Sequence, residues 1–101
     1  MIPEELSIKT IEKVYQQIKP YINTTPLIKA DNNIDDTFNS NIYLKYECFQ
    51  KSGSFKARGA INNILSSSEK DLENGITAVS AGNHAIAASY AANIFNLKNK
   101  I

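Results

Sequence analysis

The sequence ITAVSAGNHAIAASYAANIFN, residues 76–96, combines a strand, a sharp turn and a helix in one stretch. Residues 76–79 form a short apolar run of strand length, and residues 83–96 form an alanine-rich stretch of helical length. Gly82 stands between them, where a glycine allows the tight turn that joins a strand to a helix. Residues 98–101 look like the approach to a second strand. The order strand, helix, strand is typical of the crossover unit of a parallel sheet.

A similar order of elements precedes this stretch. Residues 42–46 alternate strand-forming side chains with a two-residue period. A helix beginning near Phe55 or Lys56 is predicted by apolar residues at helical spacing, namely Ala57, Ala60, Ile61, Ile64 and Leu65. The predicted fold class is therefore α/β, a parallel sheet with crossover helices over residues 42–101. Because only two or three strands are visible, we expect the chain to be the amino-terminal portion of a larger protein.

Local signals predict the remaining elements. Apolar residues at three- and four-residue spacing predict a helix over residues 8–18, with Ser7 as its cap and Pro20 at its end. Residues 31–40 are interpreted as a polar loop. Residues 68–71 resemble a helix-capping sequence, with Gly75 at the exit of one short turn of helix.

Composition excludes several classes of function. Of 101 residues, 43% are hydrophobic and 21% charged, as in a globular protein, and the net charge of +1 is too balanced for nucleic acid or an anionic membrane. No apolar run approaches the roughly 18 to 20 residues of a membrane helix. Cys48 is the only cysteine, and residues 1–5 lack the pattern of a secretory signal. We expect a cytoplasmic protein.

Lys56 stands at the first turn of a predicted helix, within Ser52–Ala60 (SGSFKARGA). The positive end of the helix macrodipole disfavours an ammonium group there, and Arg58 adds to this effect if the two side chains approach each other. A lysine held partly as the neutral amine is suited to covalent catalysis through an imine. An ordinary surface lysine is simply solvated. The position alone leaves both interpretations open.

The turn between the strand and the helix, residues 80–84, consists of Ser80, Ala81, Gly82, Asn83 and His84. A strand that turns through a glycine into a helix exposes backbone N–H groups at the positive helix end, and such a turn binds a carboxylate or a phosphate. The alternative is that Ser80 or Asn83 only caps the helix and Gly82 only makes the turn.

Other catalytic chemistry lacks the residues it needs. His84 is the only histidine, so no zinc cluster can form within these residues and no metal site is predicted. Ser80 lies in no nucleophile motif, and Cys48 has no evident base. Gly53 and Gly59 enclose five residues, one too many for a phosphate-binding P-loop, and the glycines do not form a dinucleotide-binding fingerprint.

Two stretches together resemble the pyridoxal-phosphate-dependent threonine/serine dehydratases, or threonine ammonia-lyases. They are Lys45–Ala60 (KYECFQKSGSFKARGA) and Ser80–Ala85 (SAGNHA), and the resemblance extends to Thr25–Leu27 (TPL). The resemblance implies the tryptophan-synthase-β-like fold of fold-type II enzymes and closeness to serine racemase. It also implies that the chain is one partial domain. About residues 1–52 would be the amino-terminal segment of the large domain, and about residues 53–101 the start of the small domain.

The resemblance implies roles for single residues. Lys56 forms the imine with pyridoxal phosphate, Phe55 lies against the cofactor ring, and Asn83 bonds the cofactor's 3-hydroxyl group. Residues Ser80–His84 hold the substrate carboxylate. The implied reaction eliminates water from threonine or serine and yields 2-oxobutanoate or pyruvate with ammonia. We therefore expect a small amino-acid substrate, and a homo-oligomer when the protein is full length.

Related activities differ at single positions. Cysteine synthases of the same fold usually have an acidic residue where Ala57 stands and a threonine where His84 stands, which disfavours them. Serine racemases usually have a serine where Ala81 stands, as a second proton carrier. Alanine cannot carry a proton, so Ala81 favours elimination over racemisation. The dehydratase pattern usually has glutamine and glycine where Ile86 and Ala87 stand, and the sequence departs from it there.

Parts of the family's cofactor site are missing from these residues. No two glycines are adjacent, so nothing here supplies the glycine-rich loop that binds the cofactor phosphate, and the residue that meets the pyridine nitrogen is also missing. We expect the 101-residue chain alone to be inactive as an enzyme. Two alternatives stay open: a truncated product that survives as an interaction fragment, and an anion-binding α/β domain without a cofactor.

Overall fold

The computed structural model describes Pro3 and residues 6–101. In chain order the elements are α1 (Ile8–Ile18), the 3-10 helix η2 (Lys19–Tyr21), β1 (Leu27–Lys29), α2 (Asn32–Phe38), β2 (Tyr43–Lys45), the 3-10 helices η3 (Glu47–Phe49) and η4 (Lys51–Gly53), α3 (Lys56–Ser66), α4 (Glu69–Leu72), β3 (Ile76–Thr77), α5 (Asn83–Ile94) and β4 (Asn99–Lys100). Among the described residues no helix has the length and apolar character to span a membrane. The prediction about a secretory signal in residues 1–5 falls mostly outside this described range.

The local sequence signals place several boundaries correctly. The predicted helix over residues 8–18 is α1, and the Ser7 side chain accepts a hydrogen bond from the Thr10 N–H at 3.2 Å. Ser68 and Asp71 form a capping box at the start of α4. Gly75 follows α4 with a φ of +85°, a left-handed conformation that glycine adopts readily. The chain can therefore turn directly from α4 into β3.

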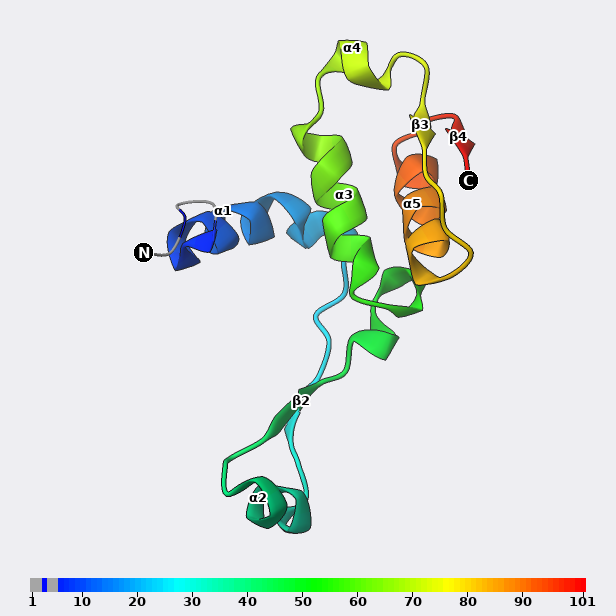
Figure 1. Cartoon of the computed structure of the whole chain (residues 1–101). Helices are drawn as coiled ribbons and strands as arrows, with labels where there is room; N and C mark the ends of the chain where they lie inside the picture. Colours follow the sequence, from blue (N-terminus) through cyan, green and yellow to red (C-terminus); the bar gives the residue numbers. More distant parts are fainter. Residues whose placement is uncertain (1–2, 4–5) are drawn as a thin grey trace.

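The helices α3 and α5 run side by side, and α1 packs on α3 (Figure 1). Their contact is the core of the described structure, formed by Ile18, Ala57, Ile61, Ile64 and Ala91. Ala57, Ile61 and Ala91 are completely buried. Alanines on both helices allow the backbones to approach closely. This packing fixes the distance between the two helices that carry the candidate site residues.

The strands form two separate two-stranded sheets. β3 and β4 are parallel, with Ile76 opposite Asn99, and α5 connects them as the crossover helix. This unit confirms the strand, helix, strand order predicted from residues 76–101. β1 and β2 pair antiparallel, with Leu27 opposite Lys45. The prediction that the strand over residues 42–46 shares one parallel sheet with the later strands is therefore wrong for the described residues. Alternation shows that a segment is a strand but does not identify its neighbour.

The interpretation of residues 31–40 as a loop is also wrong, because Asn32–Phe38 form α2. Asp31 caps this helix by accepting a hydrogen bond from the Asn33 N–H at 2.8 Å. Asn39 ends it in a left-handed conformation, with a φ of +48°. Polar caps at both ends thus support a seven-residue helix that has too few apolar residues to show a clear period.

Candidate functional site

Lys56 is the first residue of α3, as predicted. Phe55 precedes the helix and makes no side-chain cap, and the first turn contains no acidic residue. The Lys56 Nζ lies 5.7 Å from the centroid of the Phe55 ring. The amine therefore stands at an uncapped positive helix end, beside an exposed aromatic face.

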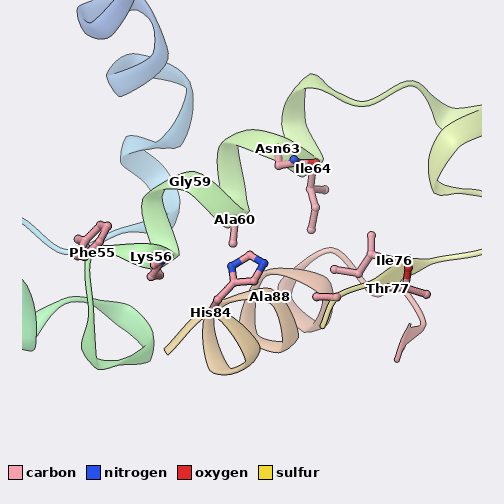
Figure 2. Close-up of a pocket in the computed structure, with 11 residues that line it drawn as sticks. Phe55, Lys56, Gly59, Ala60, Asn63, Ile64, Ile76, Thr77, His84 and Ala88 are labelled. Carbon is pink, nitrogen blue, oxygen red and sulfur yellow. The ribbon is translucent and has the colours of Figure 1, made fainter. Parts of the chain in front are cut away.

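A cavity of about 250 Å³ lies between α3 and α5, and residues of β3 also line it. Its walls carry Phe55, Lys56, Ala60, Thr77, His84 and Ala88. Figure 2 shows the His84 imidazole rising from α5 towards Ala60 of α3, with Lys56 at the start of the facing helix. The lining is mostly apolar, with the Lys56 amine, the His84 ring and the Thr77 hydroxyl among its polar groups. Such a lining is typical of a small-molecule site.

The turn that leads into α5 leaves the first backbone N–H groups of the helix without a side-chain cap. Gly82 precedes the helix, and no side chain caps it. The Ser80 hydroxyl accepts a hydrogen bond from the Gly82 N–H at 3.2 Å, which orders the turn itself. The alternative that Ser80 or Asn83 only caps the helix is therefore wrong. The first-turn N–H groups of α5 stay available for an anion.

The structure brings three of the predicted residues to one cavity and leaves four beside it. Phe55, Lys56 and His84 line the cavity. Ser80, Ala81, Gly82 and Asn83 form the turn immediately before His84, and all but Ser80 are exposed. Thr77 and Asn63 also line the cavity, and the sequence analysis did not predict them. They lie on ordinary strand and helix positions, so no local pattern distinguishes them.

Two buried hydroxyl groups near Lys56 have no hydrogen-bond partner among the described residues. They belong to Ser52 and Ser54, which lie four and two positions before Lys56. Ser52 also has a φ of +62°, a conformation that residues other than glycine rarely adopt. A buried hydroxyl without a partner costs about 1 to 3 kcal/mol. The segment before Lys56 therefore holds two buried hydroxyl groups whose hydrogen-bonding capacity is unused among the described residues.

Glu47 and Arg58 form an ion pair behind the start of α3. The Nε and Nη2 atoms of Arg58 donate to the two carboxylate oxygens of Glu47, each at 2.8 Å, and the Thr25 hydroxyl donates to the same carboxylate. The hydrogen bond from Arg58, followed by that from Thr25, lowers the pKa of Glu47 to about 2 although burial opposes the shift. The pair likewise raises the pKa of Arg58. The Arg58 charge is thus neutralised by Glu47.

No pattern in the sequence identifies Glu47 as part of this ion pair. Thr25, Glu47 and Arg58 are separated by 22 and 11 positions, so no helical or strand period connects them. Only the fold brings them together.

We expect the Glu47 ion pair to stabilise the full-length protein in a pH-dependent way. The pKa of Glu47 in the folded protein, about 2, lies below the ordinary value of 4.5. The stabilisation is therefore complete above about pH 4.5 and is lost as the pH falls towards 2. Glu47→Gln should lower the free energy of unfolding by on the order of 2 kcal/mol at pH 7. Urea unfolding at pH 7 and pH 3 measures this difference, which should shrink at pH 3; an equal difference at both pH values would contradict it.

The family of the chain follows from comparison with known proteins. A family model described as pyridoxal-phosphate dependent enzyme matches residues 18–101. The chain belongs to this family. The matched residues include both the Lys56 segment and the turn before α5. The predicted dependence of the family on pyridoxal phosphate is therefore confirmed.

Individual members of the pyridoxal-phosphate-dependent family match most of the chain. It is 44% identical over 92 residues to the biosynthetic L-threonine dehydratase IlvA of Staphylococcus saprophyticus, covering 91% of this chain and 22% of that protein. It is 38% identical over 89 residues to the serine racemase of Dictyostelium discoideum, covering 88% of this chain and 27% of that protein. The crystal structure of serine racemase from Dictyostelium discoideum superposes with a TM-score of 0.80 at 38% identity, covering 92% of this chain and 30% of that one.

These likenesses confirm the predicted fold class, an α/β portion of a fold-type II pyridoxal-phosphate enzyme. The chain spans about a quarter of the length of the curated relatives it matches. The residues present fit the cofactor of the family. Lys56, which carries a primary amine, lines the cavity, and the uncapped start of α5 beside it can bind an anion.

Proposed function

We propose that the full-length protein is a pyridoxal-phosphate-dependent threonine/serine ammonia-lyase. The observation that carries this proposal is the placement of the Lys56 amine at the uncapped start of α3, on the same cavity as His84. The family membership and the 44% identity to a threonine dehydratase support it. Threonine would yield 2-oxobutanoate and ammonia, and serine would yield pyruvate and ammonia.

Four features of the chain would hold the cofactor and the substrate. Lys56 would bind the cofactor covalently through its Nζ, and the exposed face of Phe55 would lie against the ring. Asn83 would donate to the ring hydroxyl. Residues Ser80–His84 would bind the substrate carboxylate with the free N–H groups at the start of α5. Pyridoxal phosphate, when bound, supplies a conjugated ring that withdraws electrons from the substrate α-carbon.

Lys56 would also move the proton that starts the elimination. With the cofactor holding the substrate, the Lys56 Nζ would be a free amine at the start of α3. This amine would accept the α-proton of the substrate. Water would then leave from the β-carbon. A later hydrolysis would consume one water molecule and release ammonia, so that ammonia is the net group lost from the substrate.

Racemisation is the second candidate function, because serine racemases are also similar to the chain. It needs a proton carrier on each face of the substrate α-carbon. Ala81 lies in the turn that would bind the substrate and has no group that carries a proton. This single position favours elimination.

Ala81→Ser in the full-length protein tests this distinction. We expect the serine hydroxyl to raise D-serine formation from L-serine at least about tenfold, because it supplies a second proton carrier. Chiral chromatography measures D-serine, and a coupled assay measures pyruvate. Ala85→Ser, which adds the same hydroxyl four positions later in α5, is the control and should change neither product. Strong D-serine formation by the wild-type protein, unaffected by Ala81→Ser, would favour the racemase.

The direct test of the proposed activity is product analysis of the purified full-length protein. We expect 2-oxobutanoate from L-threonine in amounts that exceed D-serine formed from L-serine under the same conditions. Absence of any 2-oxo acid, with the cofactor bound, would contradict the proposal. We further propose that the protein works in the cytoplasm, which accords with an exposed free thiol at Cys48. Assembly as a homo-oligomer and a domain division near residue 52 stay predictions.

A further inference from the structure

The first turn of α3 is held from outside the helix. No side chain caps it, and no acidic residue occupies its first turn. Arg58 lies in this turn and makes a two-point contact with Glu47. Only 28% of the Arg58 side chain and 15% of the Glu47 side chain are exposed. A bidentate contact of this kind restricts rotation as well as distance.

Glu47 is itself fixed to the amino-terminal part of the chain. Thr25, which is 4% exposed, donates its hydroxyl to Glu47, and its carbonyl accepts from the Lys45 Nζ at 2.7 Å. Beside it, the buried Gln50 side chain bonds Asn23 twice, accepting from its N–H at 2.8 Å and donating to its carbonyl at 2.9 Å. Segments distant in the sequence therefore converge on the Glu47 carboxylate.

Lys56 and Arg58 point to different sides of α3. Residues that are two positions apart in an α-helix differ by about 200° of rotation around the helix axis. Lys56 accordingly lines the cavity between α3 and α5, whereas Arg58 lines a groove between α1 and α3. Arg58 is not among the residues that line the Lys56 cavity. It can influence a ligand there only by fixing the helical turn that the two residues share.

We propose that Arg58 and Glu47, supported by Thr25, are positioning residues that hold the first turn of α3 so that the Lys56 amine points into the cavity. The inference rests on the proposed function, because it concerns the amine to which pyridoxal phosphate would attach. It assigns the ion pair a role in orienting Lys56 in addition to its role in stability.

The test measures the rate at which pyridoxal phosphate attaches to Lys56 of the full-length apoprotein, well below the unfolding temperature. Stopped-flow absorbance gives the rate, and borohydride reduction with peptide mapping confirms the site. Glu47→Gln removes the charge, and Arg58→Lys keeps the charge but removes the two-point contact. We expect each variant to slow attachment at least about tenfold and to lower kcat more than it changes KM. A role in stability alone would lower only the unfolding temperature.

The Lys29–Asp35 ion pair provides a matched control. The Lys29 Nζ and the Asp35 Oδ2 lie 3.1 Å apart. Asp35 belongs to α2, which connects β1 to β2 and lies far from α3 and α5 (Figure 1). Asp35→Asn should therefore leave the attachment rate unchanged. Thr25→Val removes one hydrogen bond to Glu47 but keeps the ion pair, and it should slow attachment about threefold. If a charge variant does not fold, the attachment rate of Thr25→Val tests the positioning role instead.

Two results would overturn the inference in distinguishable ways. If the wild-type protein is labelled at Lys56 and the variants attach the cofactor within twofold of its rate, the positioning role is wrong and the proposed function stands. If the wild-type protein takes up no label at Lys56, the proposed function fails and the inference fails with it.

Discussion

Lys56→Ala in the full-length protein should abolish the visible absorbance of covalently bound pyridoxal phosphate and lower turnover of threonine by on the order of 1000-fold or more. The variant removes the amine that would hold the cofactor and the base that would accept the substrate's α-proton. Because Lys56 is exposed at the start of α3 and outside the core, the loss should come without unfolding. Absorbance spectra, 2-oxobutanoate assays and thermal unfolding measure the three effects separately.

Lys51→Ala is the matched control for this experiment. Lys51 is also an exposed lysine, five positions before Lys56 in η4, and it does not line the cavity. We expect wild-type absorbance and turnover from this variant. If Lys51→Ala lost activity as completely as Lys56→Ala, the effect would not report on the amine at the start of α3.

Gly75→Ala should destabilise the protein by about 3 kcal/mol or more. Gly75 has a φ of +85°, and a Cβ atom there would lie 2.2 Å from the backbone oxygen of Lys98. That oxygen accepts the Ile76 N–H at 2.9 Å, so relief of the clash must separate β3 from β4. Because a backbone atom is on the other side of the contact, no side-chain rotation can relieve it. Urea unfolding of the full-length protein measures the loss.

Gly53→Ala separates the two causes. Gly53 also has a positive φ, +74°, but a Cβ atom there would meet nothing within 4 Å. This control should therefore show the conformational cost alone, about 1 kcal/mol. Equal destabilisation by the two substitutions would contradict the steric contact with Lys98.

Elements with strong local signals could be predicted from the sequence, and elements defined by distant partners could not. α1 has an apolar stripe, the Ser7 cap and Pro20 just after its end, so its boundaries follow from adjacent residues. α2 has polar caps but little apolar periodicity, and the sequence analysis missed it. The pairing of β2 with β1 depends on a contact that alternation within one strand does not encode.

The candidate site shows the same division. Lys56 and His84 were identified because each belongs to a contiguous motif, and the structure places both on one cavity. The Glu47–Arg58 pair was missed although both residues lie within the stretch that carries the resemblance. Their interaction depends on how η3 folds back against α3, which no short-range pattern predicts.

Peptide mapping of the borohydride-reduced, full-length holoprotein is the decisive measurement for the role of Lys56. Reduction converts a cofactor imine into a stable amine, so mass spectrometry identifies the lysine that holds pyridoxal phosphate. We expect one cofactor per chain, attached to Lys56 in the first turn of α3. A label on any other lysine, with Lys56 unmodified, would contradict it.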